Sequence, residues 1–341
     1  MRKPLFLLFV SILLCSHDLY IKMETYFLQP DQEASLSLYN GTFEKSENVI
    51  DRDRMLDASV VAHGEREFIH PEQWKDRSHN TVTQLPFNTG EAGTYVVGVS
   101  TKARNIELTA DKFNDYLEHD GVLDMLEQRT QDSLLEQDAV ESYQKHVKAI
   151  YQVGDKRTDD WSAELGYPIE FVPQANPYEK YSGEQLAVRL LLDGEPLPNQ
   201  LVYANYIESI HAHAHEGHNH AHDDHDHVHD HDHAHDHEGH NHGEDAAAED
   251  EHTHTSGQQL RTNEQGVVNV DLPADGIYYL RTIHMTAVND STELTHQSKW
   301  ATLTFEVSHS HDHSFLMWGL LAGGLLILGV LFLFIRRRNQ G

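Results

Sequence analysis

Between His211 and His254 the chain contains a tract in which almost every second or third residue is a histidine. The tract holds seventeen of the 28 histidines, together with thirteen carboxylates and no lysine or arginine. Neutral imidazole is the commonest metal ligand in proteins, and a segment without ammonium or guanidinium groups does not repel a divalent cation. The tract therefore predicts binding of divalent transition metals.

The spacing within the tract is mainly His-x-His, which places neighbouring imidazoles on one side of an extended chain about 6.6 to 7 Å apart. A chain that bends can bring two or three of them, with an aspartate, around Zn(II), Ni(II), Co(II) or Cu(II). Many overlapping sites imply a high metal-binding capacity and low selectivity among metals. We therefore expect the bound metal to be nickel, cobalt or zinc. The candidate ligands are His211, His213, His215, His218, His220, His222, His225, His227, His229, His231, His233, His235, His237, His240, His242, His252 and His254.

Two histidines outside the tract are further candidate ligands. If a signal peptide is cleaved after Ser16, His17 offers its α-amine and its imidazole as a chelate for Cu(II) or Ni(II). His284 lies on a predicted strand and could converge with His17, or it could be an ordinary core histidine. The histidines without ligand spacing are expected at the surface: His63, His70, His79, His119, His146 and His296. His309, His311 and His313 alternate again, either to pass metal toward a membrane partner or as a polar collar.

The two ends of the chain predict export and anchoring. Met1-Arg2-Lys3 and the apolar run that follows have the form of a secretory signal, residues 1–16. Residues 315–335 are 21 uncharged residues, about 31 Å as a helix, which matches the hydrocarbon core of a bilayer. The arginines at 336–338 should stay in the cytoplasm with the tail 336–341, so the rest of the chain lies on the other side of the membrane.

Composition narrows the chemistry further. The only cysteine is Cys15 at the signal boundary, so the exported part has neither a disulfide nor a Cys-ligated zinc site; acylation of Cys15 is the alternative reading of this boundary. The net charge of −30 argues against nucleic acid as a partner. No motif indicates an enzyme.

The hydrophobic pattern predicts a mainly β fold with two β-sandwich-like domains. Period-two segments occur at 19–23, 34–38, 94–99, 186–192, 201–204, 267–272, 277–286 and 300–307, with turns at Asn40-Gly41 and Asp193-Gly194. Three helices are expected between them: one capped by Thr109, one over 120–128, and one carrying Tyr143, Val147, Ile150 and Tyr151. The predicted units are an N-terminal β-rich domain (17–105), a helical segment (106–160) and a C-terminal antiparallel sandwich (161–307). The histidine tract is a polar insertion, 208–257, between two strands of the last.

Several phrases resemble a known family. HDLYIK, NGTFEKSEN, FNDYLEHDGV, YQKHVKAIYQVG, LGYPIEFVPQANPY, GEQLAVRLLLDGEPLPNQLVYA, NEQGVVNVDLPADGIYYLRTIHM and KWATLTFEV occur in this order. They are similar to a bacterial envelope family described as periplasmic components of cobalt- or nickel-type uptake systems. The resemblance covers nearly all of residues 16–307 and implies an exported β-rich protein whose mature chain starts at or near His17. The histidine tract and the C-terminal span depart from the family's minimal pattern.

These observations predict a periplasm-facing protein of the bacterial inner membrane that captures or buffers transition metal for an uptake system. Its expected partners are metal ions, the membrane, and a permease or outer-membrane receptor. Two alternatives remain open. One is a structural or adhesive β-sandwich protein with an incidental tract, and the other is a copper redox enzyme built on a terminal histidine. No second histidine follows His17 at a spacing diagnostic for the enzyme.

Overall fold

The computed structural model describes residues 17–77, 81–208 and 255–308. These residues form mainly β-structure, arranged in several sheets with two α-helices, which confirms the coarse fold prediction. In the part of the chain that is described, no helix is long and apolar enough to cross a bilayer. The predicted signal 1–16, the predicted span 315–335 and the histidine tract lie outside the described residues.

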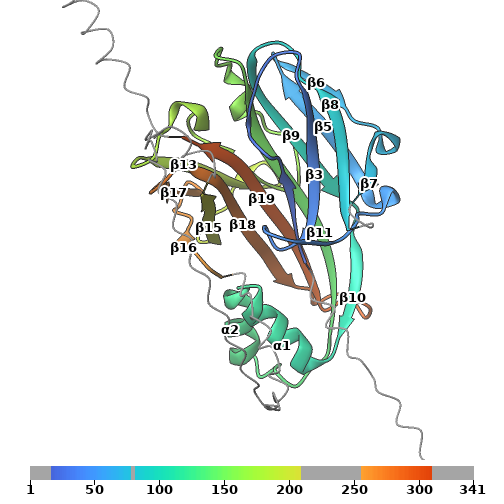
Figure 1. The fold of residues 1–341 in the computed structure, drawn as a ribbon. Coiled ribbons are helices and arrows are strands. Elements are labelled where there is room, and N and C mark those ends of the chain that lie inside the picture. The colour runs from blue at the N-terminus through green and yellow to red at the C-terminus, as the bar shows by residue number, and fades with distance from the viewer. Residues whose placement is uncertain (1–16, 78–80, 209–254, 309–341) are drawn as a thin grey trace, which may run out of the picture.

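A ten-stranded sheet runs through the molecule in the order β16-β15-β18-β19-β11-β9-β5-β6, with β10 and β2 also paired to β11. Figure 1 shows β18, β19, β11 and β9 side by side at its centre. Its strands are β2 (Phe27–Leu28), β5 (Met55–Ala62), β6 (Glu65–Phe68), β9 (Gly93–Thr101), β10 (Arg104–Leu108), β11 (Ala139–Val153), β15 (Leu201–Glu208), β16 (Gln258–Arg261), β18 (Gly276–Ala287) and β19 (His296–Val307). The sheet thus takes strands from both predicted β-rich domains, whose boundaries stay predictions.

Two smaller sheets complete the β-structure. The five-stranded sheet contains β1 (Asp18–Lys22), β3 (Glu33–Gly41), β4 (Ser46–Asn48), β7 (Lys75–Arg77) and β8 (Val82–Asn88). The four-stranded sheet contains β12 (Ile169–Pro173), β13 (Gln185–Leu192), β14 (Glu195–Pro196) and β17 (Val267–Asp271). The predicted Asp193-Gly194 turn joins β13 to β14, and both of its residues have positive φ, 51° and 84°, as a two-residue hairpin turn requires. At Asn40-Gly41 the structure has a β-bulge, not the predicted turn.

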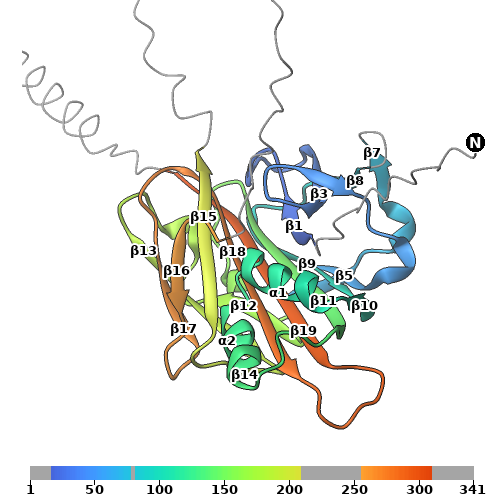
Figure 2. The same ribbon diagram turned by 90° about the horizontal axis from the view of Figure 1, so that it is seen from below.

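The smaller sheets cover opposite faces of the large one. Tyr151 of β11 packs against Phe87 of the five-stranded sheet, whereas Lys148 contacts Glu170 of the four-stranded sheet. Because successive side chains of a strand point to opposite faces, odd-numbered residues of β11 face one layer and even-numbered residues face the other. Figure 2 shows β1, β3 and β8 as the layer that faces β5, β9 and β11. The central strands are therefore buried on both sides.

Strand β11 (Ala139–Val153) lies where the sequence predicted a helix. Residues 143–151, predicted as a third helix, lie in the middle of a 15-residue strand. A strand that is buried on both faces loses its alternating pattern, and apolar residues at 143, 147, 150 and 151 then imitate a helical stripe. Strand β11 also pairs in parallel with β19, from Glu141↔His296 to Ala149↔Thr304, whereas the strand pairs within 161–307 are antiparallel. This pairing connects segments more than 140 residues apart, which no local pattern indicates.

The other two helices are present. Helix α1 (Ala110–His119) begins after Thr109 as predicted, although the Thr109 side chain makes no capping hydrogen bond, and it buries Phe113, Tyr116 and Leu117. Helix α2 (Leu123–Gln131) begins three residues later than expected. The cause is Gly121, whose φ of +72° ends the first helix and separates the two.

Two histidines expected at the surface are buried instead. His146 of β11 is 1 % exposed and His296 of β19 is 3 % exposed. Burial lowers the pKa of each to about 4, so both are neutral near pH 7. Their sequence positions gave no sign of burial because it comes from the layers packed on the sheet. His79 lies outside the described residues.

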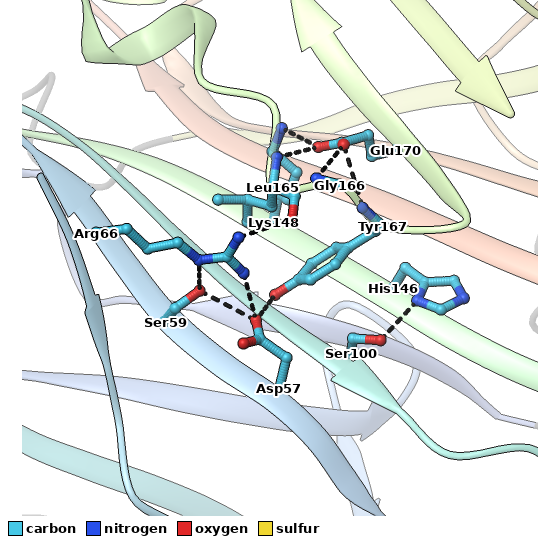
Figure 3. A network of polar contacts seen from close by, with 10 residues as sticks. All are labelled: Asp57, Ser59, Arg66, Ser100, His146, Lys148, Leu165, Gly166, Tyr167 and Glu170. Carbon is cyan, nitrogen blue, oxygen red and sulfur yellow. Dashed lines mark hydrogen bonds and ion pairs between the residues drawn. The ribbon is translucent and has the colours of Figure 1, made fainter. Parts of the chain in front are cut away.

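A buried ion pair joins the large sheet to the four-stranded sheet (Figure 3). Lys148 Nζ lies 2.8 Å from Glu170 Oε2, with the two side chains 1 % and 3 % exposed. Lys148 also donates to the carbonyl oxygen of Ala163, and Glu170 accepts from the backbone N–H groups of Leu165 and Gly166. Both charges are thus hydrogen-bonded as well as paired, which offsets the cost of removing them from water.

We expect Lys148→Met to lower the free energy of unfolding by about 3–5 kcal/mol, because it leaves the Glu170 carboxylate buried without a counter-charge. Lys148→Met combined with Glu170→Gln should recover part of the loss, because it removes the unpaired charge and the amide oxygen still accepts from the Gly166 N–H group, while the Leu165 N–H group loses its acceptor. Urea unfolding of the full chain measures both, with exposed Lys112→Met as the control. A double variant no more stable than the single variant would contradict this account.

Candidate functional site

The histidine tract is attached to a β-hairpin. Strands β15 and β16 pair in antiparallel fashion from Leu201↔Arg261 to Ala204↔Gln258, and the tract is their connection. Beyond the paired residues, Asn205 Nδ2 donates to Ser256 Oγ over 3.1 Å. The tract thus lies in the sequence between β15 and β16, and its seventeen histidines lie outside the described residues.

The attachment point of the tract lies close to the end of the described chain. Glu208 of β15 pairs with Gly276 of β18, and Gly276 pairs with Val307 of β19. These three residues form one row across the sheet, so Glu208 and Val307 are two strand spacings apart, about 10 Å. Glu208, the last described residue before the tract, and Val307, near the end of the described chain, thus lie at the same edge of the fold. His309, His311 and His313 lie outside the described residues.

His17 lies immediately before β1 and contacts two elements that are distant in sequence. Its Nε2 is 2.5 Å from Glu47 Oε2 on β4, with the side chains 24 % and 41 % exposed. Its carbonyl oxygen accepts a hydrogen bond from Lys145 Nζ of β11. The sequence gave no sign of either partner, because they lie 30 and 128 residues away. The contact with Glu47 is made by Nε2, the ring nitrogen farther from the main chain.

A buried ion pair fixes the strand that carries His17. Asp18 Oδ2 lies 2.7 Å from Arg281 Nε of β18, and both side chains are 2 % exposed. Tyr20 donates to the same carboxylate over 2.9 Å. Burial alone would lower the pKa of Arg281, but the charges of Asp18, Tyr20 and Asp120 raise it above its ordinary value. Arg281 is thus a permanent cation, and it anchors the residue next to His17.

Lys145 and Glu141 of β11 lie on the same face of the sheet as this ion pair. Burial lowers the pKa of Lys145 to about 8, although Asp18 acts in the opposite direction. Burial raises the pKa of Glu141 to about 7, against the hydrogen bonds from Ser298 and Tyr116 that lower it. Two groups on this face of β11 therefore have pKa values close to neutrality, and only Lys145 contacts His17.

His284 is not brought together with His17. Its Nδ1 lies 2.8 Å from Gln200 Oε1, and it pairs across the sheet with Lys299. Burial lowers its pKa, with the charge of Lys299 acting in the same direction. Among the described residues, no group of three or more His, Cys, Asp or Glu is arranged to hold a metal ion. The role of His284 as a ligand stays a prediction, and a nearby ammonium group disfavours a cation there.

Comparison with known proteins identifies a family. A family model described as "Domain of unknown function (DUF4198)" matches residues 14–286. The chain therefore belongs to this family. The search of curated proteins gave no significant match.

Three solved structures are similar at very low identity. The D0-D1 domain of intimin has a TM-score of 0.16 and 8 % identity, covering 84 % of this chain and 97 % of that one. A Salmonella alpha-2-macroglobulin mutant has a TM-score of 0.21 and 10 % identity, covering 84 % of this chain and 15 % of that one. A Salmonella alpha-2-macroglobulin reacted with methylamine has a TM-score of 0.18 and 9 % identity, covering 86 % and 15 %. At these TM-scores the likeness supports no inference about fold or function.

We expect Glu141→Gln to become more stable relative to the unsubstituted chain as the pH rises from 5 to 7.5. Between pH 4.5 and 7 the native state holds a proton on Glu141 that the unfolded state has released, because the pKa of Glu141 is about 4.5 in the unfolded chain and about 7 in the folded chain. The free energy of unfolding of the unsubstituted chain therefore falls as the pH rises through this range. The glutamine has no proton to lose. The difference in unfolding free energy should grow by about 2 kcal/mol over this range.

The measurement is urea unfolding of both chains at several pH values. Only the difference is informative, because buried His146 and His296 change stability in the opposite sense over part of the same range. Glu136→Gln is exposed and serves as the control, for which the difference should be flat. A flat difference for Glu141→Gln as well would show that Glu141 ionises normally.

Proposed function

We propose that this protein is a membrane-anchored, periplasm-facing binding protein that captures or buffers nickel, cobalt or zinc for an uptake system. The observation that carries the proposal is the tract itself, seventeen imidazoles and thirteen carboxylates without a competing cation. Membership of the DUF4198 family is compatible with the resemblance to uptake-associated envelope proteins. Its role would be binding, not catalysis.

The attachment geometry supports a role close to the membrane. The insertion that carries the tract starts at Glu208, which lies in one row of the sheet with Gly276 and Val307. If residues 315–335 cross the bilayer as proposed, only residues 308–314 separate Val307, and the row that contains Glu208, from the anchor. Holding many weak ligands near one membrane partner raises the local concentration of metal available to it. The partner would be a permease or an outer-membrane receptor.

His17 would supply a second, more selective site. When a carboxylate holds the far nitrogen of a metal-bound histidine, it fixes the ring and increases the basicity of the ligand. Glu47 occupies that position, so the α-amine and Nδ1 of His17 can chelate Cu(II) or Ni(II) once cleavage after Ser16 frees the amine. The hydrogen bond from Lys145 to the His17 carbonyl holds the adjoining backbone in place. The residues present therefore fit a terminal chelate, with His17 as ligand and Glu47 as its positioning residue.

The tract is tested by replacing its seventeen histidines with asparagine in the full chain, which keeps length, net charge and both attachment strands. We expect the unsubstituted protein to bind about four or five Ni(II) or Zn(II) ions at three to four ligands each, and the variant to bind at most one. Binding should weaken steeply between pH 7.5 and 5, because protons compete for the imidazole nitrogens.

Native mass spectrometry with metal analysis provides the readout. Equal metal content in the two chains, or occupancy that does not change across this pH range, would overturn the proposal.

The His17 site is tested in the asparagine-tract background, where the tract no longer competes. We expect one Cu(II) or Ni(II) per chain, lost in His17→Gln and weakened about tenfold in Glu47→Gln. Glu44→Gln, an exposed residue in the turn before β4, is the matched control. The intact mass of the exported chain shows whether His17 is its first residue, and a chain that starts elsewhere and binds no metal would refute this site.

A further inference from the structure

A cavity of about 570 Å³ opens between the five-stranded sheet and the β5-β6-β9 end of the large sheet. Its inner wall is apolar: Leu36 and Leu85 come from the five-stranded sheet, and Val60 and Ala62 come from β5. The volume falls in the range of sites that bind small molecules. This cavity is separate from His17 and from the tract.

Aromatic rings form one side of the cavity. Tyr95 and Tyr151 are stacked with ring centroids 5.1 Å apart and 16° between their planes, and Phe87 lies 5.9 Å from Tyr151. Both tyrosines are buried, at 8 % and 3 % exposure. The Tyr95 hydroxyl donates to the carbonyl oxygen of Glu91 over 2.8 Å, which fixes the ring. The cavity therefore offers a preformed aromatic surface.

Carboxylates surround the mouth of the cavity. Glu65, Glu67 and Glu91 line it and are exposed. Among the described residues that line the cavity, none is a lysine or an arginine. Burial raises the pKa of Tyr95, and the charges of Glu91, Asp160 and Glu67 raise it further. Negative potential thus reaches the aromatic wall, and an occupant with positive charge is complementary to it.

The edge that carries two of these carboxylates is rigid. The turn between β5 and β6 is His63-Gly64, with φ values of 55° and 76°. Asp160 accepts hydrogen bonds from both backbone N–H groups, at 2.9 and 2.7 Å. The imidazole of His63 meets the Tyr95 ring edge-on, with centroids 5.7 Å apart. These hydrogen bonds hold His63 in the left-handed backbone region and favour one conformation of the turn.

The single cation of β6 is directed away from the cavity. Arg66 lies between Glu65 and Glu67, and it binds Asp57, Ser59 and the Leu165 carbonyl oxygen on the opposite face of the sheet (Figure 3). Because side chains alternate along a strand, this places both glutamates on the cavity side. The mouth keeps its negative charge because Arg66 is engaged elsewhere.

We propose that this cavity binds a small organic cation, an ammonium group carried on an apolar or aromatic body. The apolar wall would take the body, and the ammonium would lie between the tyrosine faces and the glutamates, where cation–π and Coulomb attraction act together. A bare metal ion does not fit, because the described residues offer no cluster of three His, Cys, Asp or Glu here. This site does not depend on the metal-binding function.

The test uses the full chain and two probes of the same shape, phenethylamine, protonated at pH 7, and neutral 2-phenylethanol. We expect saturable binding of the amine by isothermal titration calorimetry and at least tenfold weaker binding of the alcohol. Affinity for the amine should fall at high salt, as expected for exposed charges.

Glu67→Gln combined with Glu91→Gln should weaken amine binding about tenfold without changing thermal unfolding, since both side chains are exposed. The matched control is Glu107→Gln with Glu264→Gln, which removes the same charge away from the cavity and should leave binding unchanged. Three results would each overturn the proposal: no binding of the amine, equal binding of the alcohol, or equal loss in the control variant.

Discussion

The rest of the structure depends on β11 being buried on both faces. It pairs with β9 on one side and in parallel with β19 on the other, so it joins the N-terminal strands to the last strand of the described chain. Two lysines attach its two covering layers. Lys145 donates to the backbone at His17 in the five-stranded layer, and Lys148 pairs with Glu170 in the four-stranded layer. Lys148 has a carboxylate partner, whereas Lys145 has neutral oxygen acceptors and burial lowers its pKa to about 8.

The two binding functions proposed use different physical devices. The histidine tract offers many equivalent ligands, so its proposed function depends on their number. The fold contributes the β15–β16 pair, which holds the two ends of the connection. The cavity beside Tyr95 and Tyr151 offers few groups that are already in place, held by stacking and by the Asp160 hydrogen bonds. The first arrangement favours capacity and the second favours selectivity, because preformed groups lose little freedom on binding.

The sequence patterns predicted where strands and helices occur along the chain better than they predicted how these elements pack together. The strand at 186–192, its turn at Asp193-Gly194 and the helix after Thr109 were all predicted, because each follows from local periodicity and turn chemistry. Residues 143–151 were misread, because double burial removes the alternation that marks a strand. His146 and His296 were predicted to lie at the surface, because the layers that bury them are remote in sequence.

The sequence likewise predicted the chemistry of the candidate sites but not which residues surround them. The sequence by itself predicted metal binding by the tract, since its composition lacks thiolates and competing cations there, and it named His17 and His284 as candidate ligands. Only the tertiary structure decided that Glu47 and Lys145 meet His17, that Gln200 and Lys299 accompany His284, and that Glu67 and Glu91 share a cavity with Tyr151. These groups come together through strand pairing and layer packing over long separations, which short-range patterns do not encode.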